Sequence, residues 1–133
     1  MELNPKLKFL IWCVVPLTKA LYWLVGLTSA GPTEVSAPTL ALALGAFGSL
    51  SAFAGVFVTR SAEEGAAWVA KLFGTAEGKY AAWVVGLGLI ETPALFGMVG
   101  YLQSGNGVLF AALTLLSLLG WLMAKPQRRK SQP

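Results

Sequence analysis

The chain has 133 residues, of which 56% are hydrophobic and 12% charged, and its mean hydropathy is +0.66. Soluble domains carry about 25% charged residues, so this composition predicts one membrane domain over residues 1–133, with no room for a soluble catalytic domain. The chain has no histidine, and its one cysteine, Cys13, lies in an apolar run. A zinc or other metal site, a histidine-ligated haem, a histidine-dependent nucleophile and a disulfide are therefore excluded or unsupported, and no cofactor is expected.

The first expected membrane helix covers residues 7–27. Asn4 followed by Pro5 is typical of a helix start, with Asn4 as the N-cap. Pro16 should kink this helix, and Lys19 interrupts its apolar face. A secretory signal peptide is the alternative, because two lysines precede the apolar stretch. Since Lys19 splits that stretch, we favour a membrane helix that is not cleaved from the protein.

The second expected span, residues 39–59, is rich in small residues that let membrane helices approach closely. Residues 61–73 are expected to form a short interfacial helix on the membrane surface. Ser61 with Glu64 three residues later is a capping-box pattern, and Gly74 is a plausible helix stop. A docking surface for a partner is the alternative interpretation of this helix.

The third expected span covers residues 80–103 and the fourth covers residues 108–124. Residues 104–107, Ser-Gly-Asn-Gly, form a turn so short that the fourth helix must run back beside the third. Thr114 and Ser117 are the only polar residues of the fourth span, and both are expected to bond to their own helix. The sequence therefore predicts an all-α bundle of four transmembrane helices with one interfacial helix.

Apart from Lys19, every basic residue falls on one side of the membrane in this arrangement: Lys6, Lys8, Arg60, Lys71, Lys79, Lys125, Arg128, Arg129 and Lys130. The positive-inside rule then predicts a multi-pass membrane protein with both termini cytoplasmic. This topology explains the formal charge of +4 without nucleic acid as a partner. Membrane lipid is the expected partner, with headgroup contacts at Lys125, Arg128, Arg129 and Lys130.

Glu91 is the one acidic or basic side chain within the third span. It lies roughly 16 Å along the helix from Tyr80, near the middle of a hydrocarbon core about 30 Å thick. A carboxyl group there must stay protonated, face a polar cavity or pair with a cation, so Glu91 is a candidate ion-binding residue. Pro93 should bend the helix beside it, and Gly86 and Gly97 should let a neighbouring helix come close.

Lys19 is the candidate partner of Glu91. It lies roughly 18 Å into the first span, which places both charges at nearly the same depth. A Lys19–Glu91 pair would neutralise both charges and fix the register of the two helices. The alternative is that Lys19 extends along its long stem toward the membrane surface.

Residues 86–97, GLGLIETPALFG, follow a helix rich in small residues and a polar connection. This pattern resembles the second half of an ATP synthase subunit c hairpin. The resemblance covers residues 39–102, and it implies that Glu91 matches the carboxylate that binds a proton or sodium ion in that family. Three features depart from it: four expected helices instead of two, a reduced glycine run, and no Arg-Gln-Pro loop. The whole chain is closer to small four-helix bacterial membrane proteins of unassigned function that share a Leu-x-Glu-x-Pro-Ala-Leu-Phe segment. This resemblance implies a bacterial inner membrane as the location.

Two functions follow as expectations. The first is a subunit-c-like component that binds a proton at Glu91 within a homo-oligomer or a larger membrane complex. The second is a non-catalytic accessory or assembly subunit in which the Lys19–Glu91 pair is structural. A carrier or channel is less favoured because few polar residues lie inside the spans, and an enzyme is not expected because one carboxyl group without a second acid, base or metal ligand gives little chemistry.

Overall fold

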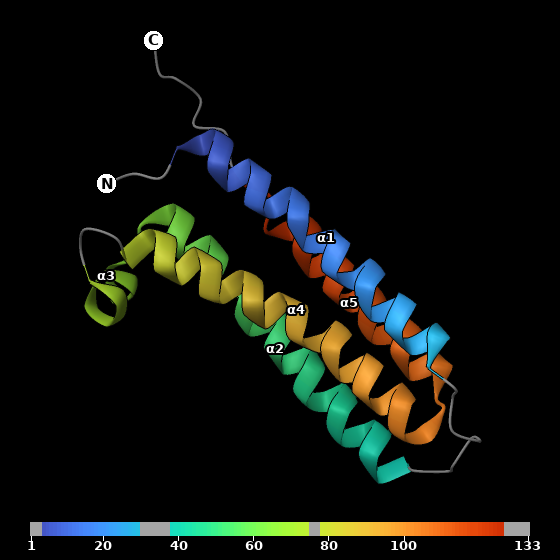
Figure 1. Cartoon of the computed structure of the whole chain (residues 1–133). Helices are drawn as coiled ribbons and strands as arrows, with labels where there is room; N and C mark the ends of the chain where they lie inside the picture. Colours follow the sequence, from blue (N-terminus) through green and yellow to red (C-terminus); the bar gives the residue numbers. More distant parts are fainter. Residues whose placement is uncertain (1–3, 30–37, 75–77, 127–133) are drawn as a thin grey trace.

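The computed structural model describes residues 4–29, 38–74 and 78–126, and all regular secondary structure in these residues is helical. Five helices follow in chain order (Figure 1): α1 (Pro5–Thr28), α2 (Pro38–Glu64), α3 (Ala67–Phe73), α4 (Gly78–Ser104) and α5 (Gly107–Met123). The expected all-α class is confirmed.

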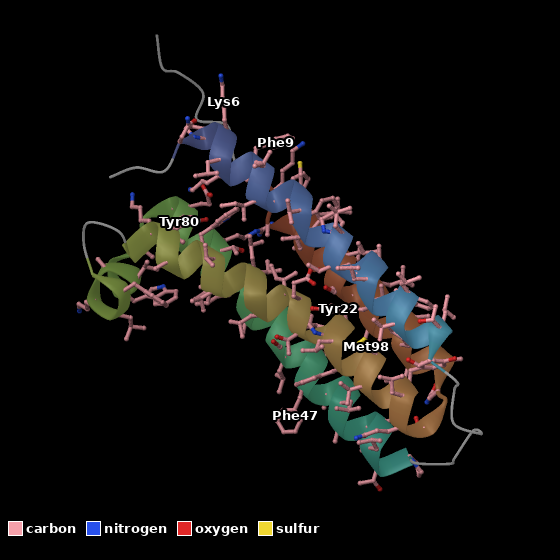
Figure 2. The ribbon with its side chains drawn as sticks, viewed as in Figure 1. Lys6, Phe9, Tyr22, Phe47, Tyr80 and Met98 are labelled. Carbon is pink, nitrogen blue, oxygen red and sulfur yellow. The ribbon has the colours of Figure 1, made fainter. Side chains whose placement is uncertain are left out.

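Three of the described helices are long and apolar enough to cross a membrane. These are α1, α2 and α4, with 24, 27 and 27 residues. The apolar helix α5 has 17 residues, which is at the lower limit of the range of about 17–25 residues that spans a bilayer. Large apolar side chains also face outward, as Phe47 does from α2 (Figure 2). These features support a membrane protein.

Local sequence determines several helix ends. The Asn4 side chain accepts a hydrogen bond from the Lys6 backbone amide at 3.0 Å, which confirms the predicted N-cap of α1. Gly74 ends α3 with φ of 88°, a conformation that glycine adopts without strain, as predicted. Asn106 caps α5 in the same way as Asn4, because its side chain accepts a hydrogen bond from the Leu109 amide.

The predicted interfacial helix over residues 61–73 is wrong in its first part. Residues 61–64 continue α2, and Ser61 lies buried inside that helix instead of capping a new one. The chain then turns at Gly65, whose φ is 72°, and α3 begins at Ala67. The capping-box pattern did not start a helix here because Ser61 is packed against the bundle and α2 runs past it.

The helix α4 forms the centre of the bundle and packs against each of the other four (Figure 1). α2 lies along one side of it, and α1 lies beside α5 on another. The start of α1, the end of α2, α3 and the end of α5 lie at the same end of the bundle. Because α4 touches every neighbour, its residues are the most buried in the structure.

The contact between α2 and α4 depends on glycines. A Cβ added to Gly55 would lie 2.6 Å from the Gly86 carbonyl oxygen, and one added to Gly86 would lie 2.5 Å from Thr59 Cγ2. Gly97 has a similar role against α5, since its added Cβ would lie 3.1 Å from Phe110 Cα. Small residues therefore allow close helix packing at these positions.

Candidate functional site

The buried stripe of α1 contains a charged residue. Trp12, Val15, Lys19 and Gly26 are the buried residues of this helix, at intervals of three, four and seven. This spacing places them along one helix face, which lies against α4 and α5. Lys19 is only 3% exposed, so it points into the bundle, and the alternative of a lysine extending to the membrane surface is wrong.

Lys19 meets Glu91 inside the bundle. Its Nζ donates a hydrogen bond to Glu91 Oε1 and forms an ion pair with it. The second carboxylate oxygen, Oε2, lies 2.6 Å from Thr18 Oγ1. Both oxygens of Glu91 are therefore engaged by adjacent residues of α1, and the two charges neutralise each other within the apolar bundle.

Thr18 gives this site two possible hydrogen-bond arrangements. Its Oγ1 lies 2.6 Å from Glu91 Oε2 and also 2.6 Å from the Val15 carbonyl oxygen. A hydroxyl group has one proton to donate. If Glu91 is ionised, Thr18 donates to the carboxylate; if Glu91 is protonated, its O–H donates to Thr18, which in turn donates to Val15. The geometry therefore accommodates either protonation state of Glu91.

The site is enclosed, although less completely on the Glu91 side. The Glu91 side chain is 16% exposed, against 4% for Lys19. Tyr22, one turn beyond Lys19, lies between α1 and α4 (Figure 2), close enough to Glu91 to interact with it electrostatically. The pair therefore lies between helices and does not face outward as an isolated carboxylate.

Pro93 lies within α4, two residues after Glu91, and its missing N–H is compensated by another helix. Proline has no N–H for the carbonyl four residues earlier, which belongs to Leu89. Ser51 Oγ on α2 donates to this carbonyl at 2.8 Å. Ser117 Oγ on α5 donates to the next carbonyl, that of Ile90, at 2.6 Å. The prediction that Ser117 bonds to its own helix is wrong, because the carbonyls near Pro93 lie within its reach.

Pro16 in α1 is compensated in the same manner. The carbonyl that it leaves free is that of Trp12, which accepts a hydrogen bond from Trp121 Nε1 at 2.7 Å. In return, Trp12 Nε1 donates to the Trp121 carbonyl at 2.9 Å. The two indole rings stack with centroids 4.2 Å apart. This reciprocal pair joins α1 to α5, and sequence reasoning did not identify it.

A second contact joins α1 to α5 at Trp23, further along α1 than Lys19. Trp23 Nε1 donates to Thr114 Oγ1 at 3.0 Å, and the Trp23 ring stacks on Phe110 with centroids 4.2 Å apart. Thr114 in turn donates to the Phe110 carbonyl, so the predicted bond to its own helix is confirmed. Together with the Lys8–Glu63 contact to α2, polar contacts therefore hold α1 at four levels along its length.

The predicted headgroup residues are described only in part. Lys125 follows the end of α5, and its Nζ lies 6.0 Å from the ring centroid of Trp12. Arg128, Arg129 and Lys130 lie outside the described residues. Within residues 4–29, 38–74 and 78–126, no group of three or more metal-ligating side chains is found.

Comparisons of the chain with protein-family models, with curated proteins and with solved structures find no match.

Proposed function

We propose that this chain is a small polytopic membrane protein that serves as a non-catalytic accessory or assembly subunit, in which the Lys19–Glu91 pair is structural. The supporting observation is the engagement of both Glu91 oxygens by α1. A carboxylate satisfied in this way holds two helices in register and is not free to act on a substrate. The outward apolar faces of the helices are then available to lipid, to a second copy or to other membrane subunits.

The proposal includes four spans with both termini cytoplasmic in a bacterial inner membrane. The support for this orientation comes from charge: Lys8 pairs with Glu63 near the end of α2, and Arg60 and Lys125 line a cavity beside Glu63. The short turn between α4 and α5 returns the chain to that end. Basic residues gathered at one end are typical of the cytoplasmic side.

A double-mutant cycle tests the structural role. Lys19→Met or Glu91→Gln alone leaves a buried charge without its partner, and we expect each to lower the free energy of unfolding by about 3–5 kcal/mol. The double variant Lys19→Met/Glu91→Gln removes both charges, so it should recover most of the loss. Thermal and denaturant unfolding of the full chain in detergent gives the measurement.

Lys8→Met is the matched control for this cycle. Lys8 pairs with Glu63 at 3.1 Å, and the Lys8 side chain is 22% exposed, against 4% for Lys19. An ion pair that water reaches contributes about 0–1 kcal/mol, so this variant should change stability little. Additive losses for the two single Lys19 and Glu91 changes, without recovery in the double variant, would refute the structural role.

Proton binding at Glu91, within a subunit-c-like membrane component, is the second candidate function. Thr18 favours it, because its position accommodates a protonated as well as an ionised Glu91. A hydrophobic carbodiimide reacts with a protonated carboxyl group, so labelling of Glu91 followed by mass spectrometry separates the two candidates. Labelling that falls as pH rises supports proton binding. No labelling from acidic to mildly alkaline pH supports a permanent ion pair.

A further inference from the structure

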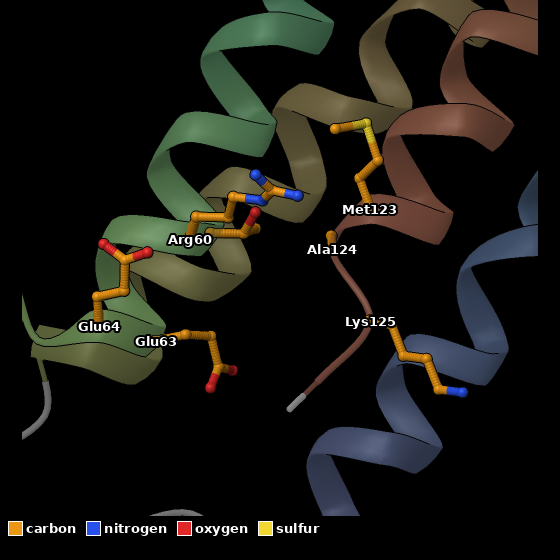
Figure 3. A pocket seen from close by; sticks show the side chains of 7 residues that line it. Arg60, Glu63, Glu64, Met123, Ala124 and Lys125 are labelled. Atoms are coloured by element: carbon orange, nitrogen blue, oxygen red, sulfur yellow. The ribbon is translucent and has the colours of Figure 1, made fainter. Parts of the chain in front are cut away.

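A cavity of about 250 Å³ lies between the ends of α2 and α5 (Figure 3). It is lined by Thr59, Arg60, Glu63, Glu64, Met123, Ala124 and Lys125. Pockets for drug-sized molecules measure about 300–1,000 Å³, so this cavity suits a smaller group. Its lining combines two cations with two carboxylates.

The cavity lies at the level expected for lipid headgroups. Arg60 is the first charged residue after the apolar part of α2, and Lys125 is the first after the apolar helix α5. Charged residues that follow directly on apolar spans lie at the boundary between hydrocarbon and headgroups. The cavity between them therefore opens where phosphate and amine groups of lipids lie.

Two of the charged side chains, those of Arg60 and Glu64, are available to a ligand. Among the described residues, Glu63 is paired with Lys8, and Lys125 Nζ lies 6.0 Å from the ring centroid of Trp12. No hydrogen bond or ion pair to a described residue is found for the side chains of Arg60 or Glu64. The Arg60 side chain extends toward the end of α5, and Glu64 lies one turn further along α2 (Figure 3). Cationic and anionic groups thus lie on the same cavity wall.

We propose that this cavity binds the headgroup of phosphatidylethanolamine. Arg60 binds the phosphate and Glu64 binds the ammonium group, because guanidinium groups form strong charge-assisted hydrogen bonds with phosphate and carboxylates form them with amines. The carboxylates select a primary ammonium, which has three N–H donors. Trimethylammonium has no N–H donor and is recognised by aromatic cages, and no aromatic residue lines this cavity.

The test is retention of lipid by the full chain in mild detergent, measured by native mass spectrometry. Phosphatidylethanolamine, phosphatidylcholine and phosphatidylglycerol with the same acyl chains are compared. We expect retention of the ethanolamine lipid roughly tenfold above the choline lipid, the factor for one hydrogen bond to a charged group. Equal retention of these two lipids, or stronger retention of phosphatidylglycerol than of either, would overturn the proposal.

Two variants test the phosphate contact and the ammonium contact separately. Arg60→Gln should lower retention of both zwitterionic lipids roughly tenfold, because it removes a phosphate ligand. Glu64→Gln should abolish the preference for ethanolamine over choline and leave choline-lipid retention unchanged. Lys71→Gln is the control, because it also removes one exposed cation, but from α3. It should change neither the retention of the lipids nor the preference for ethanolamine over choline. An unchanged preference in Glu64→Gln would overturn the assignment of the ammonium site.

Soluble glycerophosphoethanolamine distinguishes a lipid from a free ligand with the same chemistry. If the cavity is a lipid site, this compound at the concentration of the lipid should not displace it, because the acyl chains contribute most of the binding. Displacement at equal concentration would assign the cavity to a soluble ligand and overturn the proposal. This displacement experiment uses the wild-type chain, so its outcome does not depend on whether a variant folds.

Discussion

The two sides of α4 are held by different physical means. Toward α2, Gly55 and Gly86 bring two backbones so close that neither position has room for one more carbon. Toward α1, the contact depends on directed polar groups, above all Lys19 with Glu91. The contact between α2 and α4 is therefore disrupted by a larger side chain at Gly55 or Gly86. The contact between α1 and α4 is disrupted by removal of one of the paired charges.

Both α4 and α1 contain a proline whose freed carbonyl is satisfied by another helix. Pro93 frees a carbonyl that Ser51 of α2 satisfies, and Pro16 frees a carbonyl that Trp121 of α5 satisfies. In lipid an unpaired carbonyl is costly because no water can satisfy it. Each proline therefore supplies an acceptor that selects a particular neighbouring helix.

Apart from the Lys19 and Glu91 changes, the largest effect is expected at the glycine interface. In Gly86→Val, the new side chain would meet Thr59 Cγ2 at 2.5 Å and the backbone oxygen of Gly55 at 2.9 Å. Since no rotamer change moves a backbone atom, we expect a loss of about 3 kcal/mol or more in the free energy of unfolding. Denaturant unfolding in detergent, followed by circular dichroism, gives the measurement.

Gly88→Val is the matched control on the same helix. Gly88 is exposed, and an added Cβ meets nothing within 4 Å. This change should be neutral or slightly stabilising, because glycine is a poorer helix former than valine. Equal losses for the two valine variants would show that the close approach of α2 and α4 is not what limits substitution.

Among the neutral hydrogen bonds between helices, Trp121→Phe is expected to have the largest effect. It keeps an aromatic ring against Trp12 but removes the Nε1 donor, which leaves the Trp12 carbonyl unpaired and should cost about 1–3 kcal/mol. Pro16→Ala restores a backbone N–H for the same carbonyl. In that background Trp121→Phe should cost less, and an equal cost in both backgrounds would disprove the compensation.

The helices were predictable because their starts and ends depend on nearby residues. Asn4 and Gly74 act within one turn of chain, and long apolar runs of span length indicate membrane helices without knowledge of their neighbours. Counting residues also gave Lys19 and Glu91 the same depth, since the rise per residue of a helix is fixed. Ser61 is the exception, because burial against the bundle prevailed over its local capping pattern.

The partners of Ser51, Ser117 and Trp121 were not predictable. These depend on how each helix is rotated about its axis, and a helix that is apolar around its whole circumference has no polar face to indicate that rotation. The prolines were the available indication: each frees the carbonyl four residues earlier, so a donor on another helix was to be expected. Which helix supplies it follows only from the packing.

Ser51→Ala should have a smaller effect than Trp121→Phe. It removes the donor to the Leu89 carbonyl and leaves the packing of α2 almost unchanged. Hydrogen bonds between membrane helices contribute about 0.6 kcal/mol on average and up to about 1.7, so we expect a loss within that range. Ser49→Ala is the control, because Ser49 Oγ donates to the Gly45 carbonyl of its own helix. If both variants lose the same free energy of unfolding, the hydrogen bond from Ser51 to α4 makes no separate contribution.

The smallest effect is expected for Thr18→Val, which keeps the shape of the side chain and removes the hydroxyl group near Glu91. We expect a loss of about 0.6 kcal/mol, because the ion pair with Lys19 remains. Thr28→Val is the matched control, since Thr28 is exposed and bonds only to carbonyls of its own helix.

If Glu91 instead binds a proton, Thr18→Val should change the pH dependence of carbodiimide labelling, because the valine side chain can neither donate to the ionised form nor accept from the protonated one. A change in that dependence without a change in stability would favour the proton-binding role of Glu91 over the structural one.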